Sequence, residues 1–547
     1  MAASQAPTYP SDREAEIVLR DGSTVHVRPV RPDDMTAIRT FLDDVSDESI
    51  SFRFFGAVDL DWVTRWAVNV DYADRFALVA ETGSPRRVIA HAAYIRLGPT
   101  PMPARERGTG QGANGRAEVA FLVADAWQGR GISTILLAQL ADVAQQHGIA
   151  TFEAQVLPAN HRMIEVFRLS GFPVELHSTP GSIDIELPTS LSGEALACFE
   201  ERERQAAVAA VRAFLEPSSV AVIGASRRRD TVGGQILHNL LASEFAGPVY
   251  AVNEHATVVQ SLPAYHSILD VPTAVELAVV VVSAERVVDA ARKCAQAGVR
   301  ALLVISAGFA ETGAEGSRRQ RELVNVCRDA GIRIVGPNCL GVINTNADVR
   351  LNATFAPHAA TPGRVGFMSQ SGGLGIAIIE AAAKAGVGLS SFVSVGNQVD
   401  LSGNDMLRYW EQDAETDLAL LYLESFGDPR KFARIAPRFA QKKPLIAVKS
   451  GRSAAGARAT SSHTGALLSA SDVTVDALFE QAGVMRTDTL GEMLNVAALL
   501  STQPVPRGDR VAIVTNAGGP GIMCADACQA AGVSVPELPQ DIRARLA

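Results

Sequence analysis

The chain has 547 residues, of which 47 % are hydrophobic and 20 % are charged, and its net charge at pH 7 is −9. This length predicts about three or four domains, and this composition is typical of soluble globular proteins. The acidic balance argues against nucleic acid as the main partner. No apolar run approaches the ~20 residues of a membrane span, and residues 1–17 contain no apolar signal core. We therefore expect a cytoplasmic protein with no membrane partner.

The 6 cysteines are scattered along the chain, and no metal site is expected from them. Cys524 and Cys528 lie one turn apart on a predicted helix, but neither a histidine nor a second cysteine pair is close in sequence. Buried thiols in a reducing compartment are the ordinary interpretation of such cysteines.

The segment 99–116 is rich in glycine, proline and arginine and is predicted to be a mobile loop. We interpret it as a solvated insertion. The alternative is a lip whose arginines meet an acidic protein surface.

A short strand follows at 118–123, with Glu118, Ala120 and Leu122 expected on one face and the alternate residues on the other. Glu118 is then an acid on an otherwise apolar and buried strand. Gly129 and Gly131 lie between this strand and a predicted helix at 133–147. Glycines permit a close backbone approach here, and the unpaired N–H groups of a helix N-terminus form a seat for a pyrophosphate.

This pattern resembles the GNAT family of acetyl-CoA-dependent N-acetyltransferases over roughly residues 15–190. The resemblance begins at 18–22 and 27–34, the family's first strand and first helix start, and continues through QGRGIS at 128–133 to Gly171 and Phe172. It implies that the backbone of the strand pairs with pantetheine, that the glycine loop holds the pyrophosphate, and that an asparagine touches the pantetheine arm. The residues so assigned to acetyl-CoA are Phe121, Leu122, Val123, Gln128, Gly129, Arg130, Gly131, Ile132, Ser133, Thr134 and Asn160.

The resemblance also assigns a general base, Glu118. A lysine ammonium must lose a proton before its amine attacks a thioester, and a carboxylate on an apolar strand is expected to have a raised pKa that suits this task. The alternative is that Glu118 pairs with Arg116 or a surface arginine. Two positions depart from the family: Ser133 replaces the usual last small glycine or alanine, and Phe167 stands where many relatives have a tyrosine general acid. Water, or unassisted departure of the thiolate, would replace that tyrosine.

Residues 191–215 are predicted to be a helical linker, and a second domain is predicted at 216–345. Apolar strands are expected at 247–253, 277–282, 301–305 and 332–335, with helices between them. Uniformly apolar strands that alternate with helices indicate a parallel sheet covered on both faces, whose ligands bind beyond the carboxyl ends of the strands.

This second domain resembles the CoA-binding domain of ADP-forming acyl-CoA synthetases and succinyl-CoA ligases. The motifs are VIGAS at 222–226, VGG at 232–234, VISAGFAETG at 304–313 and GPNCLGVIN at 336–344. A second CoA-type site is implied at Gly224, Ala225, Ser226, Val232, Gly233, Gly234 and Asn253. Many relatives have Pro-Lys after that asparagine, whereas this chain has Glu254 and His255. An NAD-binding Rossmann domain, with Glu254 as its acid after the second strand, stays open as the alternative.

A third domain is predicted at 346–502, with RVGFMSQSGGLG at 364–375 and SSHTGAL at 461–467. In the synthetase family the histidine of the second motif carries a phosphoryl group and a glutamate steadies its loop. Those positions are His463 and Glu424 here. Backbone donors around Ser369, Ser371 and Gly372 could hold phosphate. The alternative is an inherited loop without turnover, that is, a vestigial site.

Residues 503–547 are predicted to start a second flavodoxin-like domain, with a strand from Val511, that is incomplete at residue 547. The family's ATP-grasp domain does not follow, so His463 would have no phosphate donor in this chain. We therefore expect the N-terminal part of a longer protein, or a protein whose tail is missing.

The whole chain is identified as α/β, with an N-terminal GNAT fold followed by Rossmann-like CoA-binding and flavodoxin-like succinyl-CoA-ligase-type domains with parallel sheets. This combination resembles the Pat-type bacterial protein lysine acetyltransferases. The resemblance implies acetyl transfer from acetyl-CoA to a lysine of a protein, an AMP-forming acyl-CoA synthetase, with the synthetase-like region binding CoA thioesters in a regulatory role. The alternatives are an ADP-forming acyl-CoA synthetase subunit that uses a phosphohistidine, a non-catalytic CoA sensor, and an acetyltransferase for small amines.

Overall fold

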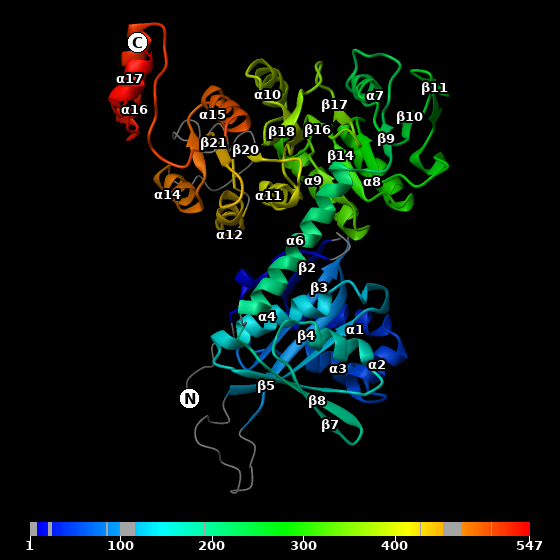
Figure 1. Ribbon diagram of the computed structural model, residues 1–547. Helices are drawn as coiled ribbons and strands as arrows, with labels where there is room; N and C mark the ends of the chain where they lie inside the picture. The colour runs from blue at the N-terminus through cyan, green and yellow to red at the C-terminus, as the bar shows by residue number, and fades with distance from the viewer. Residues whose placement is uncertain are drawn as a thin grey trace.

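The computed structural model describes residues 8–19, 24–83, 86–98, 115–190, 193–426, 428–451, 472–504 and 506–546 (Figure 1). These residues form three sheets of 8, 7 and 7 strands. The first sheet lies in the N-terminal domain, which Figure 1 shows below the other two, and the long helix α6 connects it to them.

The first sheet has the strand order β1-β2-β3-β4-β5-β6-β8-β7. Helices α1, α2 and α3 cover one face, and α4 and α5 cover the other, so that two apolar clusters enclose the sheet. The strands are β1 (Ala15–Val18), β2 (Thr24–Pro29), β3 (Arg75–Thr82), β4 (Arg87–Arg96), β5 (Arg116–Val123), β6 (Thr151–Val156), β7 (Glu175–Thr179) and β8 (Ser182–Pro188). The helices are α1 (Met35–Asp43), α2 (Asp47–Phe54), α3 (Leu60–Ala67), α4 (Ile132–Gln146) and α5 (His161–Arg168), with the short 3-10 helix η4 (Asp125–Trp127) before α4.

The second sheet has the order β11-β12-β10-β9-β13-β14-β15, and all of its pairs except β11 with β12 are parallel. Strands β9, β13 and β14 are buried along their whole length, which confirms the expected sheet with both faces covered. The strands are β9 (Val220–Ile223), β10 (Val249–Val252), β11 (Val258–Val259), β12 (Leu262–Tyr265), β13 (Leu277–Val280), β14 (Ala301–Val304) and β15 (Arg333–Val335); the helices are α7 (Val232–Ala242), α8 (Ala284–Gln296) and α9 (Ala314–Asp329).

The third sheet has the order β17-β16-β19-β18-β20-β21-β22. It takes its strand β16 from residues before the predicted boundary at 345, because β16 pairs antiparallel with β17 and β19 rather than with the second sheet. The strands are β16 (Gly341–Asn344), β17 (Leu351–Thr354), β18 (Pro362–Ser369), β19 (Leu389–Ser394), β20 (Leu418–Leu423), β21 (Leu445–Lys449) and β22 (Met485–Thr487). The helices are α10 (Gly372–Lys384), α11 (Gly403–Gln412), α12 (Pro429–Ala440), α14 (Asp472–Ala482) and α15 (Leu490–Thr502).

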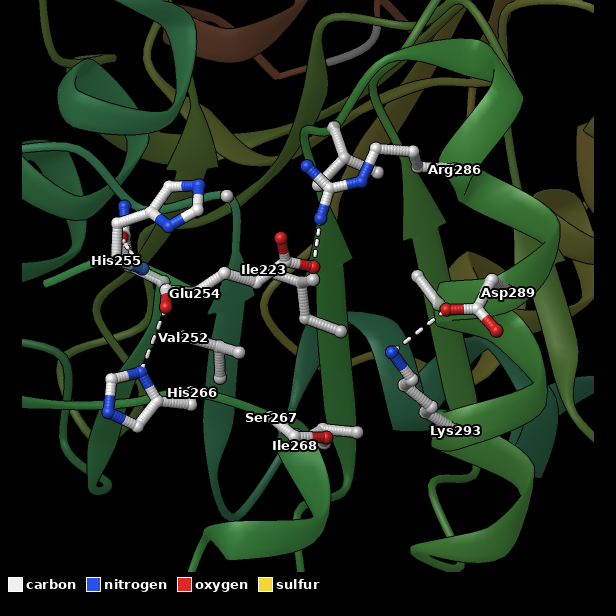
Figure 2. Close-up of a pocket in the computed structure, with 14 residues that line it drawn as sticks. Ile223, Val252, Glu254, His255, His266, Ser267, Ile268, Arg286, Asp289 and Lys293 are labelled. Carbon is white, nitrogen blue, oxygen red and sulfur yellow. Dashed lines mark hydrogen bonds and ion pairs between the residues drawn. The ribbon is translucent and has the colours of Figure 1, made fainter.

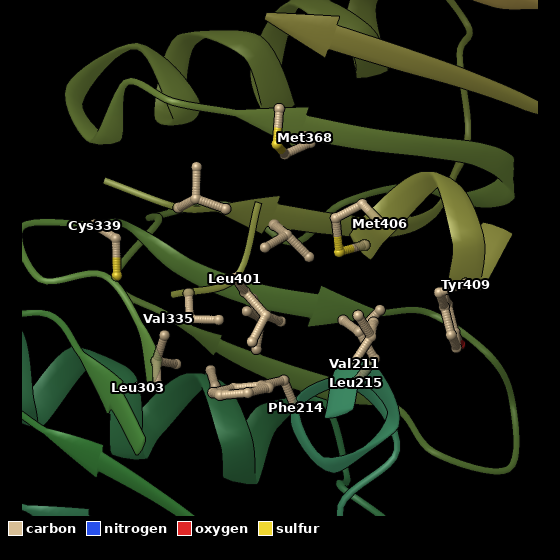
Figure 3. Packing of buried hydrophobic residues seen from close by; sticks show 14 of the residues in the cluster. Val211, Phe214, Leu215, Leu303, Val335, Cys339, Met368, Leu401, Met406 and Tyr409 are labelled. Atoms are coloured by element: carbon tan, nitrogen blue, oxygen red, sulfur yellow. The ribbon is translucent and has the colours of Figure 1, made fainter. Parts of the chain in front are cut away.

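The predicted linker 191–215 coincides with helix α6 (Gly193–Leu215). Val208 and Val211 of α6 lie in one apolar cluster with Tyr409 of α11. Phe214 and Leu215 of α6 are buried in one cluster with Leu303 of the second sheet and Met368 of the third (Figure 3). The two synthetase-like sheets therefore share a core with the linker. Ion pairs add to this contact, because Arg408 of α11 lies 2.8 Å from Glu203 of α6.

The prediction of a strand from Val511 is wrong for the described residues. After β22 the described chain forms α16 (Gly518–Ala530) and α17 (Gln540–Leu546), and residues 511–516 form no strand. The segment has a single bridge, between Arg510 and Ser534. A strand requires a neighbour that satisfies its backbone groups, and Val514 is 97 % exposed here instead of covered. Across the described part of the chain, no helix has the length and apolar character to cross a membrane.

Candidate functional site

Strands β5 and β6 separate in the middle of the first sheet. They pair in parallel only from Arg116 to Glu118, whereas β5 pairs with β4 along its length up to Val123. The edge of β5 that faces β6 is therefore without a strand partner over Phe121, Leu122 and Val123. Unpaired backbone N–H and C=O groups are satisfied by an extended ligand that carries amides, as pantetheine does. The gap lies at the segment for which the sequence predicted pantetheine pairing.

The glycine loop leads directly into the N-terminus of α4. Gly129 and Gly131 have φ of 78° and 91°, in the left-handed region that glycine adopts without strain. Gly131 is the N-cap of α4 and provides no side-chain hydrogen bond, so no side chain at the cap occupies the first N–H groups of the helix. Ile132 and Thr134, in the first turn of α4, are buried. The first N–H groups of a helix point out of its N-terminus, where a phosphate is favoured.

Gln128 and Arg130, two other residues predicted for acetyl-CoA, have protein partners for their side chains. The amide nitrogen of Gln128 donates to the carbonyl of Val123 at 3.1 Å, and its oxygen accepts from Arg162 at 3.0 Å. The guanidinium of Arg130 lies 4.6 Å from the ring centroid of Trp127 and donates to the carbonyl of Ala126. These contacts shape the loop.

Asp125 joins this loop to α2, a connection that sequence reasoning missed. Its carboxylate accepts hydrogen bonds from the Ser49 hydroxyl at 2.7 Å and from both the backbone and the hydroxyl of Ser46, the N-cap of α2. Burial favours the neutral acid, but these hydrogen bonds outweigh it and lower the pKa of Asp125. No local motif marks this contact, because its partners are more than 70 residues apart in sequence.

Asn160 is the N-cap of α5, and its side-chain oxygen accepts a hydrogen bond from the backbone of Met163 at 3.1 Å. The predicted contact with the pantetheine arm stays a prediction. Phe167 of α5 is buried and packs edge-on against Phe121 of β5, with 6.1 Å between ring centroids. The position where many relatives have a tyrosine is therefore an apolar contact beneath β5.

Glu118 is exposed, so the expectation that it is buried is wrong. The predicted alternation holds: Val119, Phe121 and Val123 belong to the cluster on the α4 side, and Leu122 belongs to the cluster on the α1–α3 side. Glu118 shares the face of Leu122, but Leu122 is buried whereas Glu118 is exposed. Its predicted alternative partner, Arg116, is paired instead with Glu153 and Glu186.

Two basic side chains on the α1–α3 side of the sheet were not predicted. Burial lowers the pKa of Arg53, on α2, to about 10, and the negative charge of Glu118 opposes this shift. The guanidinium of Arg53 also lies 5.6 Å from the ring centroid of Trp66. His91, opposite Leu122 on β4, is 7 % exposed. Burial, and to a lesser degree the charge of Arg53, lower the pKa of His91 to about 4. Its Nε2 has no hydrogen-bond partner among the described residues.

The second predicted site lies at the carboxyl edge of the second sheet. Gly224 and Asn253 line a cavity of about 120 Å³ there (Figure 2). Asn253 is held by protein contacts: its amide donates to the carbonyl of Ala225 at 2.8 Å, and its oxygen accepts from the backbone of His255 and Ala256.

The predicted glycines of this second site pack the loop 224–231 against α7. A Cβ on Gly233 would lie 2.1 Å from the carbonyl oxygen of Gly224, and a Cβ on Gly234 would lie 1.8 Å from that of Arg228. The end of β9, with Ala225 and Ser226, therefore lies directly against the first turn of α7, which begins at Val232.

The third site assembles from the ends of β18 and β20. The Gln370 side chain accepts from the backbone N–H groups of Glu424 and Ser425, and its own amide donates to the Ser425 carbonyl at 2.7 Å. Gln370 was not predicted. Ser369 and Ser371 hydrogen-bond to each other, and Ser371 is the N-cap of α10, whose first residue is Gly372. His463 lies outside the described residues. No group of acidic, histidine or cysteine side chains suited to a metal is found in the described segments.

Comparison with known proteins assigns each part to a family. The GNAT acetyltransferase family model matches residues 44–172, the CoA-binding domain model matches residues 218–345, and the model of the succinyl-CoA ligase like flavodoxin domain matches residues 362–500. Acetyl-CoA or CoA binding is thus supported for the chain.

Curated relatives cover the second and third domains. The alpha subunit of ADP-forming acetate–CoA ligase II of Pyrococcus furiosus is 42 % identical over 60 % of this chain and 70 % of its own length. The corresponding subunit of ligase I from the same organism is 40 % identical over 61 % and 72 %.

Two solved structures extend the comparison. A dinucleotide-forming acetyl-coenzyme A synthetase 1 of Ca. Korarchaeum cryptofilum, with phosphate and ADP, is 37 % identical, covers 60 % of this chain and 70 % of its own, and has a TM-score of 0.57. The GNAT domain of S. lividans PAT is 39 % identical over 33 % of this chain and 99 % of its own, with a TM-score of 0.29. The chain therefore belongs to the ADP-forming acetate–CoA ligase family in its second and third domains, and its N-terminal domain matches the GNAT acetyltransferase family model.

Proposed function

We propose that this protein transfers the acetyl group of acetyl-CoA to a lysine side chain of a protein substrate. The observation that carries the proposal is the position of Glu118, an exposed carboxylate at the last residue where β5 pairs with β6. The pantetheine arm would extend along the free edge of β5, which brings the thioester to the point where the strands separate. The pyrophosphate would lie at the N-terminus of α4.

In the proposed mechanism Glu118 accepts the proton of the lysine ammonium, directly or through a water molecule. The neutral amine then attacks the thioester carbonyl, the C–S bond breaks, and CoA leaves as a thiolate. Phe167 has no acidic hydrogen, so the thiolate takes its proton from water. An exposed base suits an acceptor that arrives from solvent as part of a large molecule, because such an acceptor does not have to enter a closed cavity.

The surface on the Glu118 side of the sheet supports a macromolecular acceptor. Phe55 and Trp62, on and beside the helices α2 and α3, are 46 % and 51 % exposed. Aromatic side chains are enriched at protein–protein interfaces. We propose an AMP-forming acyl-CoA synthetase as the acceptor, and we assign a regulatory role to the synthetase-like domains.

The test incubates the purified protein with acetyl-CoA and such a synthetase, without nucleotide, and counts acetyl-lysines by mass spectrometry. We expect one enzyme-dependent site, which is lost with Glu118→Gln and retained with Glu165→Gln, a change at an exposed glutamate on α5. Acetylation at the level of the uncatalysed reaction would contradict the proposal. Acetylation of small amines instead of the synthetase would support the acetyltransferase activity but would show that the acceptor is a small amine and not a protein.

A second candidate function is that of an ADP-forming acyl-CoA synthetase subunit. Its support is the hydrogen-bonded assembly of Gln370 with the backbone of Glu424 and Ser425 beside the N-terminus of α10. Cleavage of acetyl-CoA that depends on ADP and phosphate, with a nucleotide-binding partner subunit added, and its loss in His463→Ala, would establish this function. CoA binding without transfer or cleavage would favour a non-catalytic sensor.

A further inference from the structure

The cavity of the second domain lies at the switch point of its sheet. The chain runs from the central strand β9 outward to β10 and β12, and then returns to β13 on the other side of β9. Ligands of open parallel sheets bind at the carboxyl edge where the strand order reverses in this way. Gly224 after β9, Glu254 after β10 and Val282 after β13 all line the cavity. Figure 2 labels Glu254 among the lining residues.

The N-terminus of α7 lies beside this cavity. Thr231 is the N-cap of α7, and its hydroxyl accepts from the N–H of Gly234 at 3.2 Å. Gly233, in the first turn, packs directly against Gly224. The N-terminus of an eleven-residue helix thus lies against the loop that borders the cavity, and its partial positive charge favours phosphate. Gln260 fixes the loop, because its amide donates to the carbonyls of Ser226 and Gly234 at 3.0 Å and 2.8 Å.

The side chain that follows the second strand is an acid, Glu254. The turn made by Asn253 ties the backbone before Glu254 to the glycine loop, because the Asn253 amide donates to the carbonyl of Ala225 and its oxygen accepts from the backbone of His255. A carboxylate only accepts hydrogen bonds and repels other anions. It therefore suits the free hydroxyls of a ribose and opposes a phosphate group on the same ribose.

The basic side chains of this cavity already have acidic partners. Arg286 of α8 extends to Glu254 and forms an ion pair with it, and Lys293 lies 2.8 Å from Asp289 (Figure 2). A ribose phosphate would have to displace one of these carboxylates. Apolar side chains of Ile223, Val252 and Ile268 also line the cavity and offer a surface for a flat base.

We propose that this cavity binds an adenosine 5′-diphosphate group whose ribose carries free 2′- and 3′-hydroxyls, with Glu254 as their acceptor. The second domain then discriminates against CoA, whose ribose carries a 3′-phosphate, in favour of ligands without it. Free ADP, dephospho-CoA and NAD⁺ share the required chemistry. This inference is independent of the proposed acetyl transfer, which belongs to the first domain.

Isothermal titration calorimetry on the full chain at pH 8 tests the proposal. The probes are ADP and adenosine 3′,5′-bisphosphate, which differ in where the second phosphate is attached, followed by dephospho-CoA and NAD⁺ to distinguish the sources. The Glu254→Gln variant identifies binding to the second domain. Glu322→Gln, which breaks the exposed ion pair with Arg292 on the same domain, is the matched control.

We expect ADP to bind at least tenfold more tightly than the bisphosphate, and this preference to vanish in Glu254→Gln but to persist in Glu322→Gln. The Glu254→Lys variant is expected to reverse it. Equal or tighter binding of the bisphosphate, which would place its 3′-phosphate on Arg286, would overturn the proposal. So would the absence of any Glu254-dependent binding. Acetyl transfer measured in the same variants is expected to be unchanged.

Discussion

Glu118 of β5 and Glu153 of β6 are register partners, and they are the last pair before the two strands separate. Two acids side by side across strands repel each other. Here Arg116 forms an ion pair with Glu153 rather than with Glu118. Glu118 is the exposed acid where β5 and β6 separate. The sheet therefore presents one exposed carboxylate at the point where the free edge of β5 begins.

Gly129 offers a direct test of the glycine loop. Gly129 and Gly148, at opposite ends of α4, have φ of 78° and 71°, and a Cβ at either position would meet no atom within 4 Å. Alanine at each should cost a similar ~1 kcal/mol of unfolding free energy through left-handed strain. Gly129→Ala should also weaken acetyl-CoA binding at least tenfold, measured by calorimetry, whereas Gly148→Ala should not. Equal affinities in the two variants would move the pyrophosphate away from this loop.

His91 should make the stability of the first domain depend on pH. Burial lowers its pKa to about 4 in the folded state, from about 6.5 in the unfolded chain. The unfolded chain therefore binds a proton first, so stability is full above pH 6.5 and falls as the pH drops toward 4. In the His91→Phe variant, the fall of the unfolding free energy between neutral and acidic pH should be smaller by up to about 3 kcal/mol. Chemical denaturation at pH 7.5 and pH 4.5 measures it, and identical pH profiles would show that His91 is protonated in the fold.

Glu203 should anchor the linker helix in a pH-dependent way. Burial opposes its ionisation, but Lys431 and Arg408 outweigh that effect and lower its pKa to about 2. The stabilisation is present above the unfolded value, about 4.3, and is lost as the pH falls through the folded value.

The Glu203→Gln variant tests this anchor. The difference in Tm between it and the parent should be largest at neutral pH and narrow progressively below about pH 5. Glu380→Gln, which breaks the exposed pair of Glu380 with Lys384, is the control and should change Tm little. A constant difference at all pH values would mean that Glu203 stabilises the contact without its charge.

Local pattern was sufficient for the order of most helices and strands, whereas the predicted ligand positions stay predictions. Alternating apolar residues placed Glu118 and Leu122 on one face of a strand, and glycines placed Gly129 and Gly131 before a helix, because both signals act within a few residues. The exposure of Glu118 was missed because it depends on which distant segments cover that face of the sheet, and no local periodicity encodes this.

Contacts between distant segments account for the remaining differences. Arg53 comes from α2 and His91 from β4, and only the folded sheet brings both to the side of Glu118. Strand β16 was assigned to the second domain because its motif continues that domain's sequence, although its strand partners β17 and β19 come later. The expected strand from Val511 looks like a strand in sequence, but only Ser534 pairs near it in the described chain.

The most direct test of the central claim is the pH dependence of single-turnover acetyl transfer to the synthetase in the parent, Glu118→Gln and Glu165→Gln proteins, with acetyl-CoA affinity measured in parallel. The account predicts that Glu118→Gln slows transfer by roughly 10²–10⁴-fold, removes the fall of the rate at low pH and leaves acetyl-CoA affinity within twofold, while Glu165→Gln behaves as the parent. Transfer by Glu118→Gln at the parent rate, with the same pH profile, would contradict the assignment of Glu118 as the base.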